Sequence, residues 1–113
     1  MIGGNLIGEI QINMFKKNEI GEKEHIWITV QSIKGWLDYL SGDAQRVNYS
    51  AKIQESTHVF IADYIALNEL VNAEGTRMLI NGKVYDITLI DNPMELNRQL
   101  EIYLKYTGGQ WWV

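Results

Sequence analysis

The clearest local signal in the chain is the stretch Arg77-Met78-Leu79-Ile80-Asn81-Gly82-Lys83-Val84-Tyr85-Asp86-Ile87. Two apolar runs flank the dipeptide Asn-Gly, whose residues readily adopt the positive φ angles that a two-residue hairpin turn requires. The stretch therefore predicts a β-hairpin with its tip at Asn81-Gly82.

The segments before and after this hairpin also have sequence patterns that are typical of strands. Leu100, Ile102 and Leu104 alternate with polar or amphipathic residues, as in a strand with one buried face, and Asn92-Pro93 ends the strand before it. Residues 57–64 are apolar on nearly both faces, which indicates a central or barrel strand. Between this strand and the hairpin, the pattern of residues 65–75 predicts a short helical or irregular crossing.

The N-terminal third predicts a hairpin followed by a further strand. Residues 6–14 alternate in polarity, a polar turn rich in Asn and Gly covers residues 16–22, and a return strand follows to Val30. Residues 31–40 alternate again, with Gly35 as a candidate bulge or barrel bend.

These segments together predict a mainly β fold, a small antiparallel barrel or sandwich of about six to seven strands with a long internal loop. At 113 residues the chain predicts a single domain, 1–113. Residues 107–113 are expected to form a C-terminal tail, in which two glycines act as a flexible joint before Trp111 and Trp112. Because Trp is enriched at binding hot spots, these two rings either fold back on the domain or dock on a neighbouring subunit.

Composition restricts the classes of function. The net charge of −4 and the sequence pI near 5.1 argue against a non-specific nucleic-acid binder, which needs a positive field. The chain has no Cys, no apolar run long enough to span a bilayer and no signal-peptide pattern at its start. We therefore expect a soluble, unexported protein.

No pattern of catalytic or metal-binding residues emerges. His25 and His58 lack a metal-ligand spacing, and no Gly-rich turn joins a strand to a helix. Ser56 and His58 would share one face of a strand while Glu55 and Asp63 fall on the other, so these four residues do not converge. We expect no enzyme, no metal and no cofactor.

The segment from Ser41 to Ser56 is polar, has only a faint helical repeat and lies between two strand-like segments. Loops of more than about 12–15 residues are uncommon in small domains and are usually functional or disordered. Ordering some fourteen residues would cost roughly 14–28 kcal/mol, more than a lone small core readily supplies. The segment is expected to become ordered only against another molecule, unless it is merely a variable surface connection.

Several of these segments resemble the head-closure family of long-tailed bacteriophages, whose members are also described as head-tail joining, adaptor or stopper proteins. The resemblance covers roughly residues 10–105. It rests on a Trp in the return strand, a strand that ends in Leu-Ser-Gly, a Glu-x-Thr-His signature after a variable polar stretch, and the late hairpin. The matching positions are Trp27, Leu40, Ser41, Gly42, Thr57, His58, Gly82 and Tyr85.

This resemblance implies a homo-oligomeric ring in the virion neck, assembled in the host bacterial cytoplasm. The partners it implies are other copies of the chain, the portal or adaptor protein and a tail-completion or tail-tube protein. Packaged DNA passes through such rings without sequence-specific binding, and the long loop helps to close the channel. The implied channel residues are Ser41, Gly42, Asp43, Arg46, Asn48, Tyr49, Lys52, Gln54 and Glu55, and Trp36, Trp111 and Trp112 are candidate interface residues.

Two alternatives remain open from the sequence. A small β-barrel that binds an oligosaccharide or a peptide could use Trp36, Tyr39 and Tyr49 as stacking surfaces. A barrel that binds single-stranded nucleic acid would need a basic groove, and the acidic balance of the chain counts against it.

Overall fold

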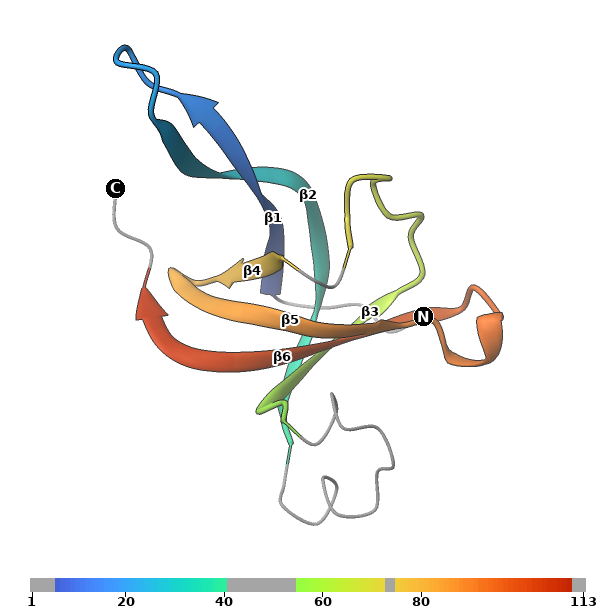
Figure 1. Cartoon of the computed structure of the whole chain (residues 1–113). Helices are drawn as coiled ribbons and strands as arrows, with labels where there is room; N and C mark the ends of the chain where they lie inside the picture. Colours follow the sequence, from blue (N-terminus) through green and yellow to red (C-terminus); the bar gives the residue numbers. More distant parts are fainter. Residues whose placement is uncertain (1–5, 41–54, 73–74, 111–113) are drawn as a thin grey trace.

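Six antiparallel strands close into a barrel in the computed structural model, which describes residues 6–40, 55–72 and 75–110 (Figure 1). The strands are β1 Leu6–Lys17, β2 Lys23–Tyr39, β3 His58–Asp63, β4 Thr76–Ile80, β5 Lys83–Asp91 and β6 Gln99–Gln110. The runs β1-β2-β3 and β4-β5-β6 are joined by pairing of β3 with β6 and of β1 with β4. The predicted mainly β fold, a small antiparallel barrel, is confirmed.

Both predicted hairpin turns are present. At the tip of β4 and β5, Asn81 has φ 51° and Gly82 has φ 77°, as the Asn-Gly signal requires. In the first hairpin, Oδ1 of Asn18 accepts the backbone N–H groups of Ile20, at 3.1 Å, and Glu22, at 2.9 Å. The side chain of Asn18 thus replaces backbone partners inside this turn.

The expected division between a return strand and a separate strand 31–40 is wrong, because β2 runs through both. The register changes between Ile10, opposite Gln31, and Gln11, opposite Thr29, which leaves Val30 as the bulged residue. No register change occurs at Gly35, which was a candidate for a bulge or a barrel bend. A Cβ atom on Gly35 would instead lie 2.5 Å from the carbonyl oxygen of Ile61, so glycine permits a close approach of β2 to β3.

The barrel interior is a single apolar core, and an irregular connection covers part of it. The core residues are Ile10, Ile33, Phe60, Ala62, Met78, Ile80, Tyr85, Ile87, Ile102 and Leu104. The connection from β3 to β4, expected to be helical or irregular, is irregular over residues 64–72 and packs Leu67 and Val71 against the core. The Gln31 side chain fixes it, donating to the carbonyl of Ala66 at 3.1 Å and accepting the N–H of Asn68 at 2.7 Å.

The first hairpin extends beyond the barrel as an arm, which we define as residues 13–28. From Glu9 to Ile12, β1 pairs with both β2 and β4, and beyond Ile12 it pairs with β2 alone (Figure 1). The apolar alternation of β1 therefore continues into solvent, and Met14 is 43% exposed although Ile10 is fully buried. The chain is elongated, with extents of 50 × 27 × 24 Å.

Residues 107–110, expected to belong to the flexible tail, lie in β6 instead. β6 continues to Gln110, which pairs with Lys83 of β5, so Gly108 and Gly109 lie within a strand. Trp111 and Trp112 lie outside the described residues.

Candidate functional site

The two ends of the 41–56 segment are held together and to the barrel by hydrogen bonds, in a region that we call the anchor. The N–H of Leu40 donates to the carbonyl of Thr57 at 2.9 Å, and the N–H of Thr57 donates to the carbonyl of Leu104 at 2.8 Å. Glu55 is exposed and Ser56 is fully buried. The other predicted channel residues lie outside the described residues, namely Ser41, Gly42, Asp43, Arg46, Asn48, Tyr49, Lys52 and Gln54.

The hydroxyl group of Thr57 joins three parts of this anchor. Its oxygen accepts the backbone N–H of Tyr106 at 2.8 Å and lies 2.8 Å from Nδ1 of His58. The carbonyl of Leu104 lies farther from it, at 3.4 Å. The hydroxyl donates to the carbonyl of Leu104 when Nδ1 carries the ring proton of neutral His58, and to Nδ1 when Nε2 carries it.

A second hydroxyl pair anchors the residue before Thr57. Oγ of Ser56 lies 2.6 Å from Oγ1 of Thr88, and Thr88 donates to the carbonyl of Tyr103 at 3.1 Å. Because the single proton of Thr88 is used in that bond, the Ser56 hydroxyl donates to Thr88. Thr88 is also the position at which the register of β5 shifts relative to β6. The anchor thus reaches β5 and β6 as well as β3.

His58 lies among three tyrosine rings, which with it form the aromatic cluster. Its ring centroid is 5.3 Å from that of Tyr85, 5.4 Å from that of Tyr39 and 6.5 Å from that of Tyr106, in edge-to-face geometry. Burial, and next the positive charge of Lys83, lower the pKa of His58, while burial raises the pKa of Tyr85. The surroundings therefore favour the neutral forms of His58 and Tyr85.

Trp27, a position of the family resemblance, lies elsewhere, where the arm leaves the barrel. The guanidinium of Arg77 lies 4.1 Å from the Trp27 ring centroid, and its Nε donates to Oε1 of Gln11 at 2.8 Å. Gln11 in turn donates to Oγ1 of Thr29 at 3.1 Å. Burial lowers the pKa of Arg77, and Asp86 opposes this effect. These contacts fix the base of the arm to β4.

The predicted positions Leu40, Thr57, His58 and Tyr85 therefore meet at the anchor, whereas Trp27 and Trp36 do not. Gly82 serves the hairpin turn. Trp36 is 45% exposed and Tyr39 is 77% exposed, but they lie on opposite faces of β2 and do not make one stacking surface.

Sequence reasoning missed Thr88 and Tyr106 as parts of the anchor. Tyr106 continues the alternation of Leu100, Ile102 and Leu104, so its inward position was within reach of the sequence. Thr88 gave no such signal, because the bulge at this residue interrupts the period of β5.

The hydrogen bonds of the anchor connect the start of β3 to β5 and β6. Ser56 and His58 are hydrogen-bonded to different partners, Thr88 and Thr57, rather than to each other. Within residues 6–40, 55–72 and 75–110, no three His, Asp or Glu side chains gather as metal ligands would. No helix in that part of the chain is long and apolar enough to cross a membrane.

Comparison with known proteins extends the description of the fold. No family model matches the chain, and no curated protein matches it in sequence. The solution structure of protein SF1141 from Shigella flexneri 2a is similar, with a TM-score of 0.69 and 17% identity. The match covers 97% of this chain and 98% of that chain. At this level of identity the likeness concerns the fold alone.

Proposed function

We propose that the chain is a head-closure subunit of a bacteriophage virion, which forms a ring in the neck between the portal or adaptor and the tail. In this role it retains packaged DNA until ejection. The observation that carries the proposal is the anchor, because it fixes both ends of the 41–56 segment at one point of a closed barrel. A rigid base is what a channel-closing segment needs.

Several features support this function. The segment itself carries Asp43 and Glu55 against Arg46 and Lys52, so its net charge is 2 − 2 = 0. A neutral lining allows DNA to pass, because tight binding of the phosphate backbone requires many Lys and Arg contacts. An extended hairpin with seven residues in each of its two strands would reach roughly 24 Å, which is comparable to the width of a duplex.

Assembly with the portal tests this function. The purified chain is mixed with the portal complex encoded beside its gene, and the mixture is imaged by negative-stain electron microscopy. The expected result is an added ring of density on the portal. A portal that stays bare at saturating concentrations of the chain, or a gene flanked by no portal, capsid or tail-tube genes, contradicts the proposal.

A further inference from the structure

At two places in the sheet, residues of like charge lie directly opposite each other on neighbouring strands. One of these pairs is positive and the other is negative. Lys17 and Lys23 are directly opposite at the tip of the arm. Asp91 and Glu101 are directly opposite where β5 ends and β6 begins. Like charges in such positions are destabilising. Each pair is thus unfavourable in a lone subunit, and opposite charges from another molecule would relieve it.

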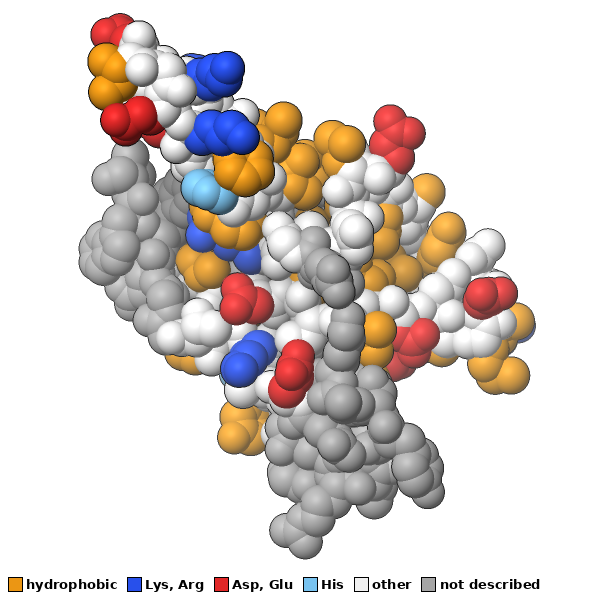
Figure 2. All heavy atoms as spheres, viewed as in Figure 1, with side chains coloured by type: hydrophobic (Ala, Val, Ile, Leu, Met, Phe, Trp, Pro, Cys, Tyr) orange, Lys and Arg blue, Asp and Glu red, His pale blue; other side chains and the backbone are white. Residues whose placement is uncertain are grey.

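The lysine pair shares its face of the arm with an aromatic pair. Phe15 lies opposite His25, two residues from the lysines on each strand, and strand residues two apart point to the same side. The Phe15 and His25 ring centroids are 4.4 Å apart, and Nζ of Lys23 lies 5.7 Å from the Phe15 centroid. We call these four residues the basic strip. Figure 2 shows Lys, His and hydrophobic side chains on the arm, with acidic side chains at its tip.

The acidic pair continues into a row across four strands. Glu101 pairs with Ile61 of β3, and Ile61 pairs with Trp36 of β2. Their neighbours along the strands, such as Phe60 and Ile102, are buried in the core, so the row faces outward. We call Trp36, Ile61, Glu101 and Asp91 the acidic strip. Like the basic strip, it combines two charges of one sign with two apolar or aromatic groups.

The carboxylate of Glu101 has a fixed orientation on the outer face of the sheet. Its Oε1 accepts the hydroxyl of Tyr103 at 3.0 Å, and its Oε2 accepts the side-chain amide of Gln99 at 2.7 Å. These bonds fix the orientation of the carboxylate, which reduces the entropy lost when a flexible lysine binds it.

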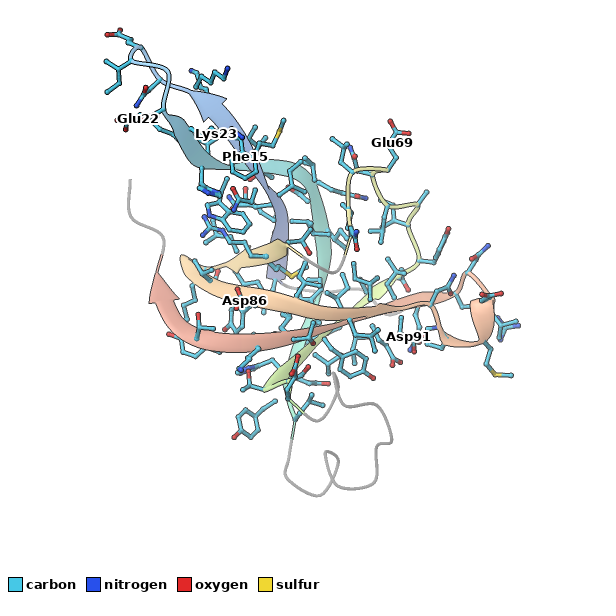
Figure 3. The ribbon with its side chains drawn as sticks, viewed as in Figure 1. Phe15, Glu22, Lys23, Glu69, Asp86 and Asp91 are labelled. Atoms are coloured by element: carbon cyan, nitrogen blue, oxygen red, sulfur yellow. The ribbon has the colours of Figure 1, made fainter. Side chains whose placement is uncertain are left out.

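The two strips lie at opposite ends of the molecule. Figure 3 shows Lys23 on the arm and Asp91 at the far end of the barrel, so one copy does not bring its own strips together. We propose that copies of this chain associate head to tail, with the basic strip of one copy docked on the acidic strip of the next. The proposal rests on the proposed function, in which this contact is the interface between neighbouring subunits of the neck ring. A repeated head-to-tail contact closes into a ring when its rotation is a whole fraction of a full turn.

A nucleic-acid strand fits the basic strip less well than a second copy does. Non-specific binding of single strands relies on aromatic faces that are open to stacking bases. The Phe15 ring already has the Lys23 ammonium over it and His25 beside it. We therefore favour the carboxylates of a second copy, rather than a nucleic-acid strand, as the partner of the basic strip.

Sedimentation velocity of the full chain tests the contact. At an ionic strength of about 0.01 M the sedimentation coefficient should rise with protein concentration, and the rise should disappear near about 1 M, where charges are screened. Lys23→Glu and Asp91→Lys should each weaken association about tenfold or more. The controls Lys16→Glu, on the opposite face of the arm, and Glu69→Lys make the same changes of net charge outside both strips and should leave association unchanged. The fourfold variant Lys17→Glu/Lys23→Glu/Asp91→Lys/Glu101→Lys exchanges the signs of both strips and should recover it.

Three results would overturn the contact: no concentration dependence at low salt, equal weakening by the control variants, or no recovery in the fourfold variant. The contact and the function fail separately. If heads retain DNA through this chain while the charge exchange has no effect, the interface is wrong and the function stands. If the charge exchange behaves as expected but the chain adds nothing to portal complexes, the function is wrong.

Discussion

The hydroxyl oxygen of Thr57 lies 2.8 Å from Nδ1 of His58 and also accepts the backbone N–H of Tyr106. Thr57, the residue before β3, and His58, its first residue, therefore connect the end of the 41–56 segment to β6 and to the aromatic cluster. This relationship gives the Thr-His pair a physical role in the isolated subunit.

Replacing Thr57 by Val keeps the shape of the side chain but leaves the Tyr106 N–H without its acceptor. We expect the free energy of unfolding to fall by about 1–3 kcal/mol, the cost of an unsatisfied polar group. Urea unfolding followed by fluorescence measures it. Thr107→Val, at an exposed position of β6, is the matched control and should change stability by less than about 0.5 kcal/mol. Equal stability of both variants would show that the hydroxyl does not anchor the segment.

The lowered pKa of His58 makes stability depend on pH. Because its pKa in the folded state lies below the unfolded value of 6.5, the unfolded chain binds the proton more tightly. The stability due to neutral His58 is complete above about pH 6.5 and is lost as the pH falls below it, toward the folded pKa.

Denaturant unfolding between pH 7.5 and 5.5 measures this dependence, which His58→Gln should reduce. Lys83→Met removes the repelling charge and should raise the pKa of His58, seen as a shift of its ring signals in an NMR titration. A His58→Gln variant with the pH dependence of the parent chain would contradict the assignment.

Gly35 predicts a steric limit between β2 and β3. The Cβ atom of a Gly35→Ala variant would lie 2.5 Å from the carbonyl oxygen of Ile61 and 2.7 Å from Cε1 of Phe60. The strands must separate, and we expect a loss of about 1–3 kcal/mol, typical of overpacking. Thermal unfolding tests this value, with Lys34→Ala at the neighbouring exposed position as the control. A variant as stable as the parent chain would mean that β2 and β3 can move apart freely.

The contact of Arg77 with Trp27 predicts a measurable coupling between the arm and the barrel. A double-mutant cycle with Arg77→Met and Trp27→Leu should give a coupling energy of about 0.5–2 kcal/mol, because the cation lies 4.1 Å from the ring centroid and is partly desolvated. Unfolding free energies of the four proteins provide the cycle. Strictly additive losses would show that the cation and the ring do not stabilise each other.

Much of the barrel could be predicted from sequence, because alternation and turn chemistry are local properties. Asn81-Gly82 and Asn18 specified their turns, and the strands of the late hairpin followed. The continuous β2 could not be predicted, since the bulge at Val30 shifts the period without any Gly or Pro to mark it.

The candidate site was predictable only in part, for a related reason. Thr57 and His58 were singled out through the family resemblance, but their partners depend on the register between β3, β5 and β6. A pairing between residues about 50 apart in the chain, such as Thr57 with Tyr106, is not visible in a local period. Likewise, the like-charge pairs of the two strips emerge only when the register is known.

The most direct test of the proposed function is the DNA content of heads assembled with a shortened segment. Residues 43–53 are replaced by a short Gly-Ser linker that leaves Leu40, Ser56 and Thr57 in place, and nuclease-protected DNA in purified heads is quantified. The function predicts that heads with this variant package DNA and then lose it, while heads with the Thr107→Val control keep it. Heads that retain as much DNA with the shortened segment as with the full chain would contradict it.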